Sequence, residues 1–351
     1  MKNWTTTKVK SLINVKLFLI LSIHYLTLFF CIGQNLKKQP EKQAVTKSNT
    51  FQTKKEEASG LIYFSMDNGQ NWRNVSNGLP ANVQIGLGGI TSSDKLLAIA
   101  TKEKGVFVYN IINNLWVNLP TEKNIIDGNI GAIMHYKNVF YVGTQSKGVF
   151  ISSDNGNVWK SLNIGLKNTT IRRFVVLQNN LYVCTNDGLY VFDEKTNNWS
   201  LEFGESGLQV NSVTKFKNTI YIATNKGIYC RNTDKAWKNM LPNHSVHNIS
   251  SDAEQLYGMT YTSLLMSSKD GINWQSTQHG LPKGLYTFNV LRHNKMLFAG
   301  QWDGIYKKND ISPKWELSSN GLPPNFAATN LQVFNNILVI STSESSNNSS
   351  K

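Results

Sequence analysis

One short pattern recurs along most of this chain and limits the folds that it can adopt. A strand, a turn and a second strand are predicted for LAIATKEKGVFVY at residues 97–109, and again for IYIATNKGIYCRN at residues 220–232. Each copy is centred on a Thr, or once on a Gln, and successive copies lie 43, 41, 39, 36, 41 and 41 residues apart. The central residues are Thr101, Thr144, Thr185, Thr224, Thr260, Gln301 and Thr342.

Two further strands belong to each copy. One lies around a Trp after the pattern, and the other begins 14 residues before the central residue. Four strands in a unit of about 40 residues are typical of a β-propeller blade. The Trp residues are Trp72, Trp116, Trp159, Trp199, Trp237, Trp274 and Trp315. The residues that mark the first strand are Leu87, Ile130, Ile171, Val210, Val246, Thr287 and Ala328.

The two ends of the repeated region complement each other. The last copy stops after its second strand, at residues 337–342, and the first begins with GLIYFSMDNGQNW at residues 60–72, which contains only a third and a fourth strand. A ring of sheets avoids free edges only if its first and last strands pair. The sequence therefore predicts an all-β fold over residues 59–343: a seven-bladed β-propeller with two-plus-two strand closure.

The N-terminal residues do not continue this pattern. Residues 17–33, LFLILSIHYLTLFFCIG, follow a basic leader, which predicts a signal peptide over residues 1–33. Cleavage after Gly33 is similar to the processing of secreted proteins from Bacteroidetes-type bacteria. Acylation of Cys31 as a lipoprotein is the second interpretation, although Phe30 stands where a lipobox needs a small residue, and an uncleaved membrane anchor is the third.

The segments on either side of the repeats have no apolar periodicity. We expect a flexible polar linker over residues 34–58 and a disordered tail over residues 344–351. With the predicted signal, this organisation points to a protein that is secreted or held in the cell envelope, and a membrane tether through the N-terminus is compatible with it.

The charge balance gives little information on partners. Lys and Arg number 36 against 22 Asp and Glu, a net charge of +14, but no basic cluster resembles a nucleic-acid motif. We therefore expect no nucleic-acid partner. Three Cys are too few for a disulfide framework, and Cys184 and Cys230 lie in strand patterns where we expect buried small side chains.

An octapeptide recurs between the third and fourth strands: SMDNGQNW at residues 65–72, SSDNGNVW at residues 152–159 and SSKDGINW at residues 267–274. Its Asp accepts backbone hydrogen bonds, its Gly adopts positive φ, and its Trp fills the space between sheets. We assign these residues a structural role. They are Ser65, Asp67, Gly69, Trp72, Ser152, Asp154, Gly156, Trp159, Ser267, Gly271 and Trp274.

On these residues the chain resembles the Asp-box, or BNR-repeat, β-propellers over residues 60–342. That group includes sialidases, xyloglucanase-type glycosidases, sortilin-type receptors and photosystem II assembly factors. The segments GLPANVQ at residues 78–84 and GLPPNFA at residues 321–327 are also similar to linkers of two-component-regulator sensor propellers. The resemblance implies the fold, and it implies ligand binding on the face that carries the loops from fourth to first and from second to third strands. It does not fix a function.

Several side chains are expected to reach that face and the mouth of the central channel. They come from the beginning of the first strands and from the turns after the second strands. Cationic, imidazole and aromatic groups there are able to bind a protein or a glycan, and an exposed Trp can stack on a sugar ring. The candidate binding residues are Arg172, Arg173, His247, Phe288, Trp302 and Asp303.

Catalysis by this face is the alternative. A glycosidase needs two carboxylates about 5 to 10 Å apart, and the loops offer Glu103, Asp127, Asp187, Glu205 and Asp303 without a telling spacing. A sialidase needs three converging Arg, and only Arg172 and Arg173 are expected at the mouth. His244 and His247 do not have the spacing of a metal site, so we expect no metal and no cofactor.

The favoured hypothesis is a monomeric, non-catalytic propeller that binds a protein or glycan partner through its loop face. A carbohydrate-active hydrolase and a ligand-sensing propeller are the alternatives.

Overall fold

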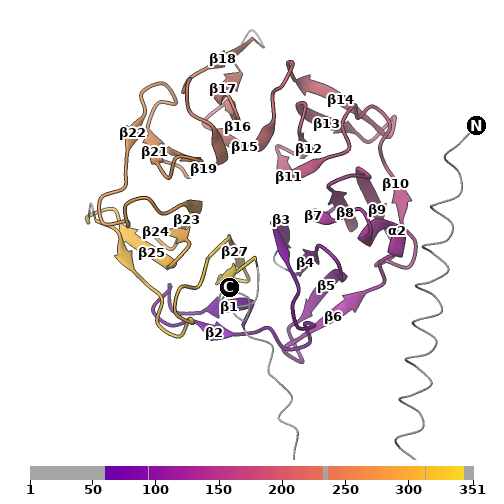
Figure 1. Ribbon diagram of the computed structural model, residues 1–351, viewed down its shortest axis with the longest axis horizontal. Coiled ribbons are helices and arrows are strands. Elements are labelled where there is room, and N and C mark those ends of the chain that lie inside the picture. The colour runs from indigo at the N-terminus through magenta and orange to yellow at the C-terminus, as the bar shows by residue number, and fades with distance from the viewer. Residues whose placement is uncertain (1–59, 94, 232–235, 313, 344–351) are drawn as a thin grey trace, which may run out of the picture. The chain divides into compact units, whose positions relative to one another are not determined.

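The computed structural model describes residues 60–93, 95–231, 236–312 and 314–343. These residues form antiparallel strands in groups of four, together with one short helix, α2 (Lys123–Ile126). Figure 1 shows the groups arranged around a central axis. The predicted signal peptide, the polar linker, the tail and Cys31 lie outside the described residues.

The first strands of the groups line the axis. They contact one another in cyclic order, and the last of them, β27, contacts the first, β3, so that the ring is closed. A single parallel bridge between Gly88 and Ala132 joins two neighbouring groups into one eight-stranded sheet. The first strands are β3 (Ile85–Ser92), β7 (Ile130–Tyr136), β11 (Ile171–Leu177), β15 (Val210–Phe216), β19 (Val246–Ser251), β23 (Thr287–His293) and β27 (Asn330–Phe334).

The other strands follow outward from the axis in chain order in six groups, and in the group that closes the ring the order from the axis is β27, β28, β1 and β2. The second strands are β4 (Leu97–Thr101), β8 (Val139–Thr144), β12 (Asn180–Thr185), β16 (Thr219–Thr224), β20 (Leu256–Thr260), β24 (Met296–Gln301) and β28 (Ile337–Ser341). The third strands are β5 (Gly105–Asn110), β9 (Val149–Ser152), β13 (Leu189–Asp193), β17 (Gly227–Arg231), β21 (Leu265–Ser268), β25 (Gly304–Asn309) and β1 (Ile62–Ser65). The fourth strands are β6 (Leu115–Leu119), β10 (Lys160–Ser161), β14 (Asn198–Phe203), β18 (Trp237–Asn239), β22 (Gln275–Ser276), β26 (Glu316–Leu317) and β2 (Arg73–Asn74).

The predicted closure of the ring is confirmed. Strand β1 pairs antiparallel with β28, with Ile62 opposite Ser341 and Phe64 opposite Val339. The resulting sheet has the order β2-β1-β28-β27 and contains two strands from each end of the repeated region. No strand edge is left open where the ring begins and ends, as the two-plus-two arrangement requires.

The central Thr residues of the repeat hold the turn between the second and third strands. Their buried hydroxyls donate to a carbonyl oxygen three or four residues later, as Thr144 does to Gly148 O (3.0 Å) and Thr224 does to Gly227 O (2.8 Å). Satisfying these groups inside the sheet explains why a Thr recurs at a fully buried position.

Six of the seven first strands carry a β-bulge near their beginning, whereas β27 pairs with β28 without a register shift. In β11 the register shifts between Ile171 and Arg173, and in β19 it shifts between Val246 and Asn248. The extra residue of a bulge is unpaired and its side chain is re-aimed. Here the extra residues of four neighbouring blades are Arg172, Asn211, His247 and Phe288.

The first blade departs from the predicted register. Ile85, and not Leu87, pairs with Thr101, and the next pair joins Ile90 to Ile99. Several extra residues therefore bulge at this point, where Gly88 and Gly89 have no room for a side chain: an added Cβ would approach backbone atoms to 2.9 Å. Leu87 is 43 % exposed instead of packing in the sheet.

The Trp residues fasten neighbouring blades together. Their indole N–H groups donate to the carbonyl that follows the fourth strand of the preceding blade, as Trp116 does to Val75 O (2.7 Å). Five of the seven Trp residues of the repeats make this bond. The indole nitrogen of Trp274 has no partner among the described residues, and Trp237 stacks on Phe203 instead, with ring centroids 4.7 Å apart.

The recurring octapeptide forms a hydrogen-bonded turn. In its first copy Ser65 Oγ donates to Asp67 Oδ1 (2.8 Å) and accepts from the N–H of Gly69 (2.8 Å), which has a φ of 76°. Asp67 also accepts from the N–H of Asn71 (2.9 Å). Ser152, Asp154 and Gly156 repeat the Ser–Asp and Gly–Ser bonds.

The third copy requires a correction. Ser268, and not Ser267, donates to Asp270 Oδ1 (3.0 Å) and accepts from the N–H of Gly271 (2.8 Å). The Ser–Asp spacing of two residues is kept, but Gly271 follows Asp270 directly, so the turn is one residue shorter than in the other copies. Alignment on the Trp alone placed the Ser one residue too early.

Candidate functional site at the channel mouth

Two adjoining cavities lie along the axis of the ring. The channel, about 400 Å³, is lined by the first strands. The mouth cavity, about 260 Å³, lies where the first strands begin and the second strands end. Its polar lining residues are Lys102, Gln145, Arg172, Arg173, Asn211, His247 and Tyr261.

The mouth cavity is cationic. Lys102, Arg172 and Arg173 line it, and no described carboxylate lines either cavity. Arg172 is held by neutral groups: its Nη1 donates to Asn186 Oδ1 (2.7 Å) and its Nη2 to the Tyr261 hydroxyl (3.4 Å). Within the ranges that the structure describes, neither Arg172 nor Arg173 forms an ion pair.

Arg173 is the deepest of these cations, because it lines the channel as well as the mouth cavity. Its Nη2 donates to the carbonyl oxygen of Leu87 (3.2 Å), while its buried Nε has no partner among the described groups. Burial lowers the pKa of Arg173 from its ordinary value. A guanidinium nevertheless stays protonated at neutral pH, so the bottom of the mouth cavity holds an uncompensated positive charge.

Two buried neutral residues line the same cavity, and each has one polar atom without a hydrogen-bond partner. His247 is 5 % exposed and Asn211 is 4 % exposed. The Nε2 of His247 and the Oδ1 of Asn211 have no partner in the described structure. Burial, with a smaller contribution from the charge of Arg173, lowers the pKa of His247 to about 3, so the imidazole is neutral. Unpaired buried polar atoms are costly, which makes their gathering at one cavity notable.

A row of aromatic rings adjoins the mouth cavity. We call Tyr261, Tyr286, Phe288 and Trp302 the aromatic ledge. His247 stacks on Tyr286 (4.1 Å between centroids), Tyr286 contacts Phe288 (5.0 Å), and Phe288 contacts Trp302 edge-on (4.9 Å). Trp302 is 50 % exposed and Tyr261 is 47 % exposed, while Phe288 is buried. The ledge therefore presents two open rings on a packed aromatic base.

The structure brings together most, but not all, of the predicted binding residues. Arg172, Arg173 and His247 line the mouth cavity, and Phe288 supports Trp302 on the ledge. Asp303 lines neither cavity: its Oδ2 accepts from the Tyr306 hydroxyl (2.7 Å). Whether any of these residues contacts a ligand stays a prediction.

Sequence reasoning missed three side chains at this site. Lys102 and Gln145 line the mouth cavity, and Tyr286 joins His247 to the ledge. A signal for the first two was present, because both directly follow a central Thr of the repeat, as Tyr261 does. Tyr286 lies just before the first strand of its blade, where the other blades show no common residue type.

Four of the five carboxylates named for the glycosidase alternative, Asp127, Asp187, Glu205 and Asp303, have local partners. Asp187 accepts from the hydroxyls of Thr185 (2.6 Å) and Tyr190 (3.0 Å). Asp127 pairs with Lys123 (2.8 Å) and Glu205 with Lys226 (3.1 Å). No described carboxylate lines the cavities, so neither cavity presents the facing pair that glycoside hydrolysis requires.

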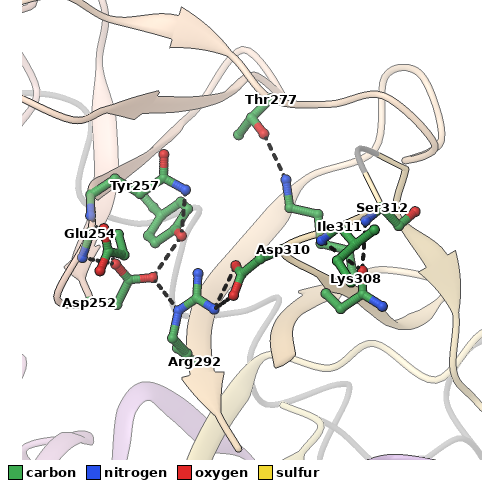
Figure 2. A network of polar contacts seen from close by, with 11 residues as sticks. Asp252, Glu254, Tyr257, Thr277, Arg292, Lys308, Asp310, Ile311 and Ser312 are labelled. Atoms are coloured by element: carbon green, nitrogen blue, oxygen red, sulfur yellow. Dashed lines mark hydrogen bonds and ion pairs between the residues drawn. The ribbon is translucent and has the colours of Figure 1, made fainter. Parts of the chain in front are cut away.

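A second polar cluster lies at the other end of β19 and β23. Figure 2 shows Arg292 between Asp252 (Nε to Oδ2, 2.7 Å) and Asp310 (Nη1 to Oδ1, 2.9 Å). Asp252 also accepts from the Tyr257 hydroxyl (2.8 Å) and from backbone N–H groups. Because Asp252 follows the strand that starts at the mouth with His247, this network lies at the opposite end. Its bonds join two blades and leave no free carboxylate pair.

Two further features bear on chemistry. The thiol of Cys184 is buried beside Arg173, and burial raises its pKa to about 12, so it is not a nucleophile at neutral pH. Among the described residues, no three His, Cys, Asp or Glu side chains cluster as metal ligands would. The described helix is too short to span a membrane.

Comparison with known proteins supports the propeller architecture. Residues 163–305 match the family described as the DUF6242 beta propeller domain. No curated protein sequence matches the chain.

Solved structures show the same fold. The extracellular domain of the putative one component system BT4673 from B. thetaiotaomicron is similar with a TM-score of 0.65 and 16 % identity, over 81 % of this chain and 39 % of that one. The extracellular domain of the putative hybrid two component system BT3049 from the same organism has a TM-score of 0.59 and 16 % identity, over 80 % of this chain and 42 % of that one. YCF48 bound to D1 peptide has a TM-score of 0.58 and 12 % identity, over 76 % of this chain and 99 % of that one. The chain thus spans about two fifths of the length of the first two.

Proposed function

We propose that this chain is a non-catalytic recognition propeller, secreted or held in the cell envelope, that binds a protein or glycan partner at the mouth cavity and the aromatic ledge. One observation carries the proposal. Unpaired polar atoms of Arg173, Asn211 and His247 are buried at one cavity, directly beside exposed aromatic rings. Such groups are satisfied when a ligand supplies their partners.

The rigidity of the ring suits recognition. Most of the rings and polar groups of the site stand on bulges and short turns that two neighbouring strands fix, so little side-chain entropy is lost on binding. Exposed Tyr and Trp rings contribute large contact areas to protein interfaces and also stack on sugar rings. The solved relatives give support from outside, since two are extracellular domains of regulatory systems and one is bound to a peptide.

A sensing role is the second candidate. It is favoured by the similarity to extracellular domains of one- and two-component systems. In that case occupation of the mouth would be relayed to another protein. The bonded Ser–Asp–Gly turns also favour assignment of the repeats to the Asp-box type, and residues 1–33 and 34–58 are proposed as export signal and tether.

The test is a screen of the full chain against an array of glycans and peptides, repeated with the double variant Arg172→Ala/Trp302→Ala. We expect retained array members to lose at least about tenfold in affinity with this variant. A matched double variant at exposed positions away from the mouth, Arg73→Ala/Ile311→Ala, should bind as the wild type does. Equal retention by both double variants would show that the binding face lies elsewhere.

A further inference from the structure

We infer that the mouth cavity is a carboxylate-binding site in which Arg173 is the anchor of the ligand. The inference rests on the proposed function and gives it a ligand class: small organic acids whose carboxylate enters the cavity and whose neighbouring ring or side chain packs on the aromatic ledge. A uronic-acid sugar and the C-terminal carboxylate of a peptide are two sources of the same chemistry.

Charge gives the first argument. A buried cation is ordinarily paired, because leaving it alone in a poorly solvated place is costly. Arg173 lines both cavities, yet its one acceptor is the neutral carbonyl oxygen of Leu87 (3.2 Å). In contrast, the half-buried Arg292 has two carboxylate partners. Among the described residues, Arg292 thus has counterions, whereas Arg173, at the mouth, has none.

The surroundings of Arg173 give the second argument. A negative charge beside Arg173 would oppose the binding of an anion, and the buried groups that line the mouth cavity with it, His247 and Asn211, are neutral. The neutral imidazole of His247 carries no positive charge that would repel Arg173, and its stacking on Tyr286 fixes the ring. Arg172 adds a second positive charge while its own donors go to Asn186 and Tyr261. A ligand anion therefore meets two guanidinium groups and no opposing carboxylate.

The shape of the site selects a carboxylate over a larger anion. A guanidinium matches a planar carboxylate through two parallel N–H bonds, which Lys cannot reproduce. The mouth cavity, about 260 Å³, accommodates a single ring or a terminal residue more readily than a folded partner. The exposed ring of Tyr261 is hydrogen-bonded to Arg172, so the place for the carboxylate and the place for stacking are contiguous.

The test is isothermal titration of the full chain with two acid and neutral pairs: D-glucuronate against D-glucose, and N-acetylphenylalanine against its amide. We expect one acid to bind at least about tenfold more tightly than its neutral counterpart. Its affinity should fall as the salt concentration rises. The pair that shows this difference identifies the source. Arg173→Gln and Arg173→Lys should each lower the affinity for the acid by about tenfold or more. Arg73→Gln, in exposed β2, should leave this affinity unchanged.

Equal binding of acid and neutral probes, or no binding of either acid, would overturn the inference. Thermal unfolding shows whether Arg173→Gln folds. If it does not, the inference is tested by the affinity of Arg172→Gln for the acid and by the preference of the wild type for the acid over its neutral counterpart. A neutral probe that binds as tightly as its acid, but weakens in Tyr261→Ala, would leave the proposed function standing and remove the carboxylate site.

Discussion

The imidazole of His247 lies parallel to the phenol ring of Tyr286, with centroids 4.1 Å apart and planes 19° from each other. The pair joins the polar floor of the mouth cavity to the aromatic ledge. Because the imidazole is buried beside Arg173, its neutral form is favoured and its pKa falls to about 3. The junction of the candidate site therefore depends on a histidine that stays unprotonated.

This dependence predicts a loss of stability in acid. The folded pKa of His247 lies below its ordinary value of 6.5, so the unfolded chain takes up the proton first as pH falls. The contribution is complete above about pH 6.5 and declines toward pH 3, by at most about 1.4 kcal/mol per pH unit. The free energy of unfolding, measured in urea between pH 4 and 7, should change less steeply with pH in His247→Gln than in the wild type. The exposed His279→Gln should keep the wild-type slope; an unchanged slope in His247→Gln contradicts the assignment.

The bonds of the Trp residues between blades predict unequal costs for the same substitution. Trp116→Phe removes the donor to Val75 O and leaves a buried carbonyl short of a partner, which costs about 1 to 3 kcal/mol beyond the lost apolar area. Trp274 has no such partner, so Trp274→Phe should cost less by about that amount. Urea unfolding measures the free energy of unfolding of both variants. Equal losses of this free energy would mean that the bond adds nothing to stability.

The corrected turn of the third octapeptide predicts a difference between adjacent serines. Ser268→Ala removes an acceptor for the N–H of Gly271 and a donor to Asp270, and should destabilise the chain by about 1 to 2 kcal/mol. Ser267→Ala, at an equally buried position, is the matched control and should cost less. Thermal unfolding measures both variants, and a larger effect at Ser267 would restore the alignment made on the Trp.

The closure of the ring predicts a sharp limit to C-terminal truncation. A chain that ends at residue 336 lacks β28 and leaves β1 and β27 without their common partner. Open strand edges favour aggregation, so we expect loss of cooperative unfolding and association in size-exclusion chromatography. A chain that ends at Ser343 keeps every described strand and should behave as the full chain does. A monomeric, cooperative product ending at residue 336 would contradict the role of the closure.

Most of the fold followed from the repeat. A Thr whose hydroxyl must be satisfied inside the sheet and a Trp that bonds across blades impose a spacing that is visible in the sequence, and the missing strands at the two ends predicted the pairing of β1 with β28. The register of the first blade could not be predicted in this way. The glycines near Leu87 permit a wider bulge than the other blades have, and no side-chain pattern in the sequence indicates it.

The site was predictable only in part. Arg172 and His247 occupy a bulge position that recurs in five blades, so their place at the mouth followed from the period. Asp303 lines neither cavity, and the Tyr306 hydroxyl, three residues later in the chain, donates a hydrogen bond to its carboxylate. The unpaired state of Arg173 and the stacking of Tyr286 depend on which blades are neighbours across the channel, and linear spacing carries no such information.

The most direct test of recognition at the mouth is hydrogen–deuterium exchange of the full chain with and without the most strongly retained array member. The account predicts slower exchange in residues 170–174, 245–248, 261–263 and 284–289, which surround the mouth cavity and the ledge. Slower exchange confined to residues 66–71, 153–158 and 269–273, the turns between third and fourth strands, would place the partner away from the mouth and contradict the account.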